Sequence, residues 1–193
     1  TKPIPLDTSK NFSWKISNPE DVANFSATGY TFGKFLYDKL KVPIGLINVS
    51  YGGSPVEAFM DAASLEGCHF RLPDPNDQSR LSNKVPTVLY NGMIHPVIGY
   101  GIKGFIWYQG ESNADRPQQY ETLFPVFVRM LRTQFGQGDF PFYYVQIAPF
   151  DYNNNKKKSS KTDAKANSII SYHSTQDRNS SSNSMFITTG NTK

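Results

Sequence analysis

Two short apolar runs constrain the fold of this chain most strongly. "IGLINVS" at residues 44–50 and "KGFIWYQ" at residues 103–109 are apolar along most of their length and do not alternate with polar residues. Continuous runs of this kind are typical of strands that are covered on both faces in a parallel sheet. Two further runs, "PFYYVQIA" at 141–148 and "MFITT" at 185–189, predict a third and a fourth strand.

The segments around these strands have the spacing of amphipathic helices. From residue 20 to residue 41, apolar residues recur every three or four positions, and Pro43 ends the pattern. A similar stripe covers residues 120–131, where Pro125 marks either a kink or a late start and Gly136 a C-terminal stop. Helices that alternate with buried strands predict an α/β domain with a mainly parallel sheet. Such sheets bind ligands at the carboxyl ends of their strands.

The composition is that of one globular domain. The chain has 193 residues, of which 38% are hydrophobic, enough to bury one core of ordinary size. Residues 1–19 carry three prolines and are predicted to form an extended lead-in. The Asn-, Lys- and Ser-rich segment near 153–163 is predicted to be a low-complexity surface insertion, followed by a weak helix. Much of the net charge of +4 lies there without interleaved aromatic residues, so we do not expect nucleic acid as a partner.

Disulfide, metal and membrane chemistry are not expected. Cys68 is the single cysteine, which excludes an internal disulfide, and no Cys/His pair has the spacing of a zinc site. We therefore expect no metal. No apolar run reaches the length of about 18 residues that a membrane span needs, and residues 1–10 lack the apolar core of a signal peptide.

The stretch "NVSYGGSPVEAF" at 48–59 follows the first predicted strand and invites comparison with a nucleophile elbow. Neither Ser50 nor Ser54 has the Gly-x-Ser-x-Gly spacing that an elbow needs. Ser54 is followed by Pro55 and, three positions on, by Glu57, which is the pattern of a helix-capping box. We therefore predict that Ser54 caps a helix and is not a nucleophile.

Two strand ends offer groups that could hold a developing negative charge. Gly52 and Gly53 lie between a strand and a predicted helix, where backbone N–H groups lack partners, so they form either an oxyanion site or only a tight turn. In "QGESN", Glu111 could orient a histidine, while the amides of Gln109 and Asn113 could donate to an oxyanion. The same five residues would also suit an exposed loop with a helix cap. The residues alone leave both alternatives open.

No histidine stands at a predicted strand end, where a catalytic base is expected. His95 lies beside Pro96 in an apolar loop and is more typical of a structural residue. His69 lies in a polar loop and His173 in the weak C-terminal helix. The nucleophile and the base are therefore unassigned.

Four segments together resemble the sialate O-acetylesterase family of SGNH-type carbohydrate esterases. In family order, they are "NPEDVANFSATGYTFGKFLYDKLKVPIGLINVSYGGSPVEAFM" (18–60), "LYNGMIHPVIGYGIKGFIWYQGESNA" (89–114), "RPQQYETLF" (116–124) and "GQGDFPFYYVQIAPFDY" (136–152). The resemblance implies a three-layer α/β/α sandwich of the SGNH hydrolase, flavodoxin-like type. It also implies cofactor-free hydrolysis of acetyl esters on the hydroxyls of sialic acid, by a serine nucleophile and a histidine base.

The resemblance assigns roles to some residues of this chain. It implies that Gly53 is a backbone oxyanion donor, that Glu111 supports the histidine, and that Gln109 contacts the oxyanion or the substrate. Gly52 and Asn113 are expected to contact substrate. The family's exported members imply a secreted, periplasmic or lysosomal location.

Two further blocks of the family are not found in this sequence. The serine of the family lies in a Gly-Gln-Ser-Asn block upstream of the helix predicted at 20–41, and the histidine in a downstream Asp-x-x-His block. We therefore expect residues 20–193 to be an internal portion of an esterase domain. The alternatives are an esterase for acetylated xylan, or a non-catalytic fragment that binds a glycan or a protein partner.

Overall fold

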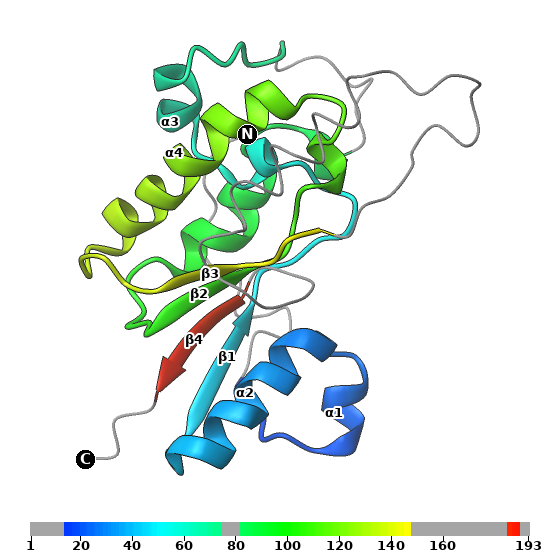
Figure 1. Ribbon diagram of the computed structural model, residues 1–193, viewed down its shortest axis with the longest axis vertical. Coiled ribbons are helices and arrows are strands. Elements are labelled where there is room, and N and C mark those ends of the chain that lie inside the picture. The colour runs from blue at the N-terminus through cyan, green and yellow to red at the C-terminus, as the bar shows by residue number, and fades with distance from the viewer. Residues whose placement is uncertain (1–13, 75–81, 148–184, 190–193) are drawn as a thin grey trace, which may run out of the picture.

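The computed structural model describes residues 14–74, 82–147 and 185–189, and four strands form one sheet in it (Figure 1). The strand order is β1-β4-β2-β3. The bounds are Ile44–Asn48 for β1, Gly104–Trp107 for β2, Phe142–Tyr144 for β3 and Met185–Thr189 for β4. All four predicted strands are thus present, although the first three end earlier than their apolar runs.

Strand directions follow from the pairings. β2 pairs in parallel with β3, whereas β4 lies between β1 and β2 and is antiparallel to both. Phe186 of β4 is opposite Ile47 of β1 on one side and opposite Phe105 of β2 on the other. Because β1 and β2 both oppose β4, they run in the same direction, as does β3. Three of the four strands are therefore mutually parallel, which confirms the α/β fold with a mainly parallel sheet.

The helix predicted at 20–41 is in fact two helices, α1 (Pro19–Ala23) and α2 (Ala27–Leu40). The break occurs because Ser26 leaves the helical conformation and its hydroxyl accepts a hydrogen bond from the Gly29 N–H at 3.2 Å, which caps α2. α2 ends at Leu40, and the residue that caps it, Lys41, has a left-handed φ of 55°. The prediction placed the end of the helix correctly, but it was wrong to treat α1 and α2 as one continuous helix.

The second predicted helix is α4 (Pro117–Phe135). It starts at Pro117, a favoured first-turn position for proline, so Pro125 lies inside the helix and a late start is excluded. Gly136 follows with a φ of 63° and ends α4, as its position in the sequence predicts.

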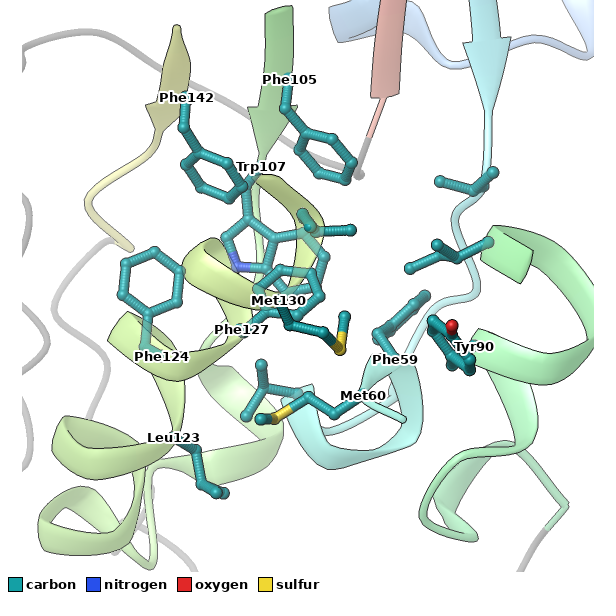
Figure 2. Close-up of a cluster of buried hydrophobic side chains, with 14 of the residues drawn as sticks. Phe59, Met60, Tyr90, Phe105, Trp107, Leu123, Phe124, Phe127, Met130 and Phe142 are labelled. Atoms are coloured by element: carbon teal, nitrogen blue, oxygen red, sulfur yellow. The ribbon is translucent and has the colours of Figure 1, made fainter. Parts of the chain in front are cut away.

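Helices cover both faces of the sheet, which gives the three layers (Figure 1). Ile106 of β2 packs toward α2, in a cluster with Phe32 and Leu36. Its neighbours Phe105 and Trp107 point to the other face and join the main core beneath α4. Figure 2 shows these two rings, with Phe142 of β3, directed at α4.

Short helices complete the described part of the chain. They are η1 (Val56–Phe59), α3 (Ala62–Gly67), η2 (Ser82–Lys84), the π-helix η3 (Tyr90–Ile94), η4 (His95–Val97) and η5 (Glu111–Asn113). Residues 14–18 contain no helix or strand, and residues 1–13 of the predicted lead-in lie outside the described residues. The insertion near 153–163 and the helix predicted after it lie outside the described residues.

Candidate functional site

Two loops meet at the carboxyl edge of the sheet. The turn Gly52–Gly53–Ser54 follows β1, and the loop 109–113 follows β2. Since β1 and β2 run in the same direction, both loops leave the sheet on the same side, although more than fifty residues separate them in the sequence. We call residues 52–54 and 109–113 the polar edge.

Direct hydrogen bonds join the two loops. The amide nitrogen of Gln109 donates to the Ser54 carbonyl oxygen at 3.1 Å, and the Val56 N–H donates to the Asn113 side-chain oxygen at 2.9 Å. Asn83, from η2, closes the turn from outside by donating to the Gly52 carbonyl at 3.2 Å and to the Ser54 hydroxyl at 3.3 Å. The polar edge is therefore a single connected unit.

Gly52 and Gly53 form an exposed turn at the start of this unit. Gly53 has a φ of 72°, in the left-handed region that side chains with a Cβ rarely adopt. Both glycines are exposed, and the Gly53 N–H donates to no atom of the described residues. The turn thus leaves a backbone donor at the surface of the polar edge.

Ser54 corrects one prediction, because it does not cap a helix. η1 begins at Val56 after Pro55, and no side chain caps it. Ser54 is only 3% exposed as a residue, and its hydroxyl accepts a hydrogen bond from Asn83 instead. The capping-box prediction was wrong for a physical reason. The side chain of Glu57, the second residue of the box, makes hydrogen bonds to residues elsewhere in the fold instead.

Those partners reveal two functional candidates that the sequence reasoning missed. The Glu57 carboxylate, only 1% exposed as a residue, accepts from the Asn113 amide nitrogen at 2.8 Å and from the Arg116 guanidinium at 2.7 Å. Burial lowers the pKa of Arg116, but the hydrogen bond and charge of Glu57, together with those of Asp115, raise that pKa overall. A signal existed in the sequence, since Glu57 is the one charge in "PVEAFM" and a buried charge needs a partner.

Gln109 offers an acceptor rather than a donor in this arrangement. Both hydrogens of its amide nitrogen are used, by the Ser54 carbonyl and by the Asn113 side-chain oxygen at 2.7 Å. Its amide oxygen is buried and has no hydrogen-bond partner among the described residues. A buried acceptor without a partner is costly, so a donor that reached this oxygen would lower that cost.

Asn113 and Glu111 differ sharply in exposure although both belong to η5. The Asn113 side chain is 0% exposed and contacts Val56, Gln109 and Glu57, all from within the protein. Glu111 is exposed, and its carboxylate accepts no hydrogen bond from a described residue. Glu111 is therefore free to meet a group outside the described residues, whereas Asn113 faces inward.

Helix α4 anchors the loop from below. The Tyr120 hydroxyl donates to the Gln109 carbonyl at 3.3 Å. Burial raises the pKa of Tyr120 well above its usual range, so the phenol stays protonated and remains a donor. The ring of Trp107, which lies two residues before the loop, packs against Phe127 with ring centroids 4.5 Å apart. The strand end that leads to the loop is therefore packed against α4, and Figure 2 shows Trp107 beside Phe127.

The described histidines do not join the polar edge. His69 and His95 are both exposed, and His95 contacts the Tyr90 ring edge-on at 5.9 Å. His173 lies outside the described residues. Within residues 14–74, 82–147 and 185–189, no group of three or more His, Cys, Asp and Glu side chains could hold a metal ion. None of the helices described is long and apolar enough to cross a membrane.

A mainly parallel α/β sandwich with convergent polar loops at its carboxyl edge is the architecture of an SGNH-like hydrolase. The family profile "Carbohydrate esterase, sialic acid-specific acetylesterase" matches residues 5–192, so the chain belongs to this family of carbohydrate esterases. The structure is also similar to a carbohydrate acetylesterase from Xanthomonas citri, with a TM-score of 0.72 and 36% identity over 89% of this chain and 37% of that one.

Two mammalian sialate O-acetylesterases are also similar to this chain. The sialate O-acetylesterase of Homo sapiens is 39% identical over 133 residues, which is 64% of this chain and 25% of the human protein. That of Rattus norvegicus is 30% identical over 163 residues, covering 65% of this chain and 30% of the rat protein. The chain thus spans about a quarter to a third of the length of these relatives.

Proposed function

We propose that this chain forms part of a carbohydrate O-acetylesterase that removes acetyl groups from the hydroxyls of sialic acid. The observation that carries the proposal is the meeting of the Gly52–Gly53 turn with the loop 109–113 at one edge of the sheet. The family to which the chain belongs, and the names of its mammalian relatives, support the choice of an acetyl ester and of a sialic acid.

The Gly53 N–H is the proposed oxyanion donor, with Gly52 lining the substrate beside it. When a serine attacks the acetyl carbonyl, negative charge develops on the carbonyl oxygen, and an exposed N–H without a partner can bind that charge without rearranging. Loss of one such donor typically slows an enzyme by about 100- to 1,000-fold. Neither Ser50 nor Ser54 is proposed as the nucleophile.

Gln109 is proposed to contact the substrate through its amide oxygen. Because its nitrogen is already used twice, the oxygen is the group that remains, and a sugar hydroxyl is a donor of the right kind. Asn113 was also expected to contact substrate. Its complete burial favours a supporting role behind Gln109 instead.

Glu111 is proposed to orient the histidine base and stabilise its charged form. An exposed carboxylate at the polar edge suits this role, since it accepts no hydrogen bond from the described residues that would compete with an imidazole. No group of this chain is assigned as the base.

Acetate release by the full-length protein tests the proposed function. O-acetylated sialic acid and acetylated xylan should be compared at equal acetyl concentration, since the second is the substrate of the alternative esterase. We expect faster turnover of the sialic acid. Preferred turnover of xylan would change the substrate class, and no acetate from either would refute the esterase assignment.

A further inference from the structure

Glu57 occupies an unusual position for a carboxylate. It lies among the buried residues Val56, Ala58 and Phe59 of η1, and its own side chain is only 2% exposed. This buried carboxylate is paired with Arg116. The Arg116 side chain is 36% exposed, so the cation reaches from the surface to a buried anion. A buried ion pair often contributes little net stability, because desolvation offsets the attraction. A role in holding a specific geometry would explain the pair better than stability does.

The pair sits directly behind the polar edge. One Glu57 carboxylate oxygen accepts from Arg116 at 2.7 Å, and the other accepts from the Asn113 amide nitrogen at 2.8 Å. The same Arg116 also donates to the Ser112 carbonyl at 3.4 Å and to the Gln119 side chain at 2.6 Å. Glu57 and Arg116 thus join η1, η5 and the start of α4.

Glu57 determines which way the Asn113 amide faces. Since a carboxylate only accepts hydrogen bonds, it must meet the nitrogen of that amide, and the Val56 N–H must meet its oxygen. The opposite orientation would place two acceptors together at Glu57 and two donors together at Val56. Two independent contacts therefore fix one orientation.

The orientation of Asn113 in turn fixes that of Gln109. With the Asn113 oxygen facing Gln109, the Gln109 nitrogen must approach it, which is the contact at 2.7 Å. The Gln109 nitrogen also meets the Ser54 carbonyl, so a flipped Gln109 would face two acceptors with its oxygen. The free Gln109 oxygen is consequently held in one direction by a chain that ends at a buried charge.

We propose that Glu57 and Arg116 are positioning residues of the esterase site, which set the direction of the Gln109 amide through Asn113. Neither residue touches substrate. This inference rests on the proposed function for its effect on turnover, but the hydrogen-bond chain itself can be tested without any substrate.

Glu57→Gln is the first test, because it keeps the shape of the side chain and removes one acceptor. The two donors, from Asn113 and Arg116, would then face one oxygen and one NH₂ group, so one contact must be lost. In the full-length protein we expect kcat for acetate release to fall about 10- to 100-fold, as small misplacements of a positioning group do, with KM changed less than threefold.

Arg116→Gln is the second test and covers the case in which Glu57→Gln does not fold. Arg116 is partly exposed, and glutamine still offers an NH₂ donor, but the buried Glu57 carboxylate loses its cationic partner. We therefore expect a lower midpoint of thermal unfolding together with the same selective fall in kcat. Asp38→Asn is the matched control, since Asp38 pairs with Lys34 on the surface of α2 at 2.7 Å and lies outside the site. It should leave kcat unchanged.

The side-chain amide signals of Gln109 and Asn113 in ¹H–¹⁵N NMR spectra give an independent readout. Both amides should exchange slowly with solvent in the parent protein, and both signals should move in Glu57→Gln and in Arg116→Gln but not in Asp38→Asn. An inactive parent protein would refute the proposed function, and these signals would still decide the positioning role. Unmoved Gln109 signals, or a parental kcat in both site variants, would overturn the inference.

Discussion

At the scale of single residues, backbone conformation distinguishes the glycines of this chain. Gly53 needs its left-handed φ of 72° to turn the chain from β1 toward η1. A Cβ there would meet only the Asn83 amide at 3.8 Å, so space is not what requires glycine. Gly67, at the end of α3, has no such φ, and a Cβ there would meet nothing within 4 Å. At both positions a Cβ has room, and only Gly53 has a left-handed backbone, so the two can be compared directly.

Gly53→Ala should disturb the turn through conformational strain alone. A left-handed residue with a Cβ costs about 1–2 kcal/mol, so the turn should relax away from this φ and move its N–H. We expect the free energy of unfolding to fall by about that amount, together with a fall in kcat for acetate release. Urea unfolding and acetate assays of the full-length protein measure both.

Gly67→Ala is the control for that experiment. It should leave kcat unchanged and raise the free energy of unfolding slightly, by about 0.4–1 kcal/mol, because alanine restricts the unfolded chain. An active Gly53→Ala with parental stability would contradict the role given to the turn.

At the scale of elements, the site depends on how α4 packs against β2. Phe127 of α4 is fully buried and meets Trp107 and Phe105 of β2, with ring centroids 4.5 Å and 6.3 Å apart (Figure 2). Trp107 is the last residue of β2 and lies two residues before the loop 109–113. The position of the loop is therefore coupled to the aromatic packing below it.

Phe127→Ala should be strongly destabilising. Truncation of a buried phenylalanine costs about 3–5 kcal/mol, because the transfer free energy is lost and a cavity remains. Phe35→Ala on α2 makes the same chemical change at a side chain that is 58% exposed, and should change the free energy of unfolding by no more than about 0.5 kcal/mol. Equal effects in a urea titration would contradict the assignment of the core.

These elements also show what the sequence could predict. Continuous apolar runs located all four strands, Pro43 indicated the end of α2 and Gly136 the end of α4, because each of these signals depends on neighbours in the chain. Periodicity could not place β4 between β1 and β2, since that order depends on contacts between distant segments. It also bridged the break at Ser26, where a side-chain cap interrupts an otherwise suitable stripe.

For the candidate site too, local sequence signals identified some residues and missed those that depend on distant contacts. The loop residues Gln109, Glu111 and Asn113 were found because they follow an apolar strand. The local capping rule failed at Ser54 because the carboxylate of Glu57 pairs with Arg116, 59 residues away, and a distant ion pair can override a local motif. No local pattern contains that information.

At the scale of the whole molecule, the proposed esterase site is made by two distant loops that meet at the carboxyl edge of the sheet. Mutually parallel β1 and β2 bring the loops to the same edge, and helices on both faces hold the sheet that supports them (Figure 1). Most residues of this edge also support the fold, so their replacement mixes stability with function. Glu111 is different, since it is exposed and accepts no hydrogen bond from the described residues.

The kcat for acetate release by Glu111→Gln in the full-length protein therefore tests the proposed site with the least interference from stability. We predict a fall of about 100-fold or more, because the histidine loses the carboxylate that orients it, with the midpoint of thermal unfolding unchanged. An unchanged kcat, measured on a protein with the parental unfolding midpoint, would contradict the proposal that these loops form the esterase site.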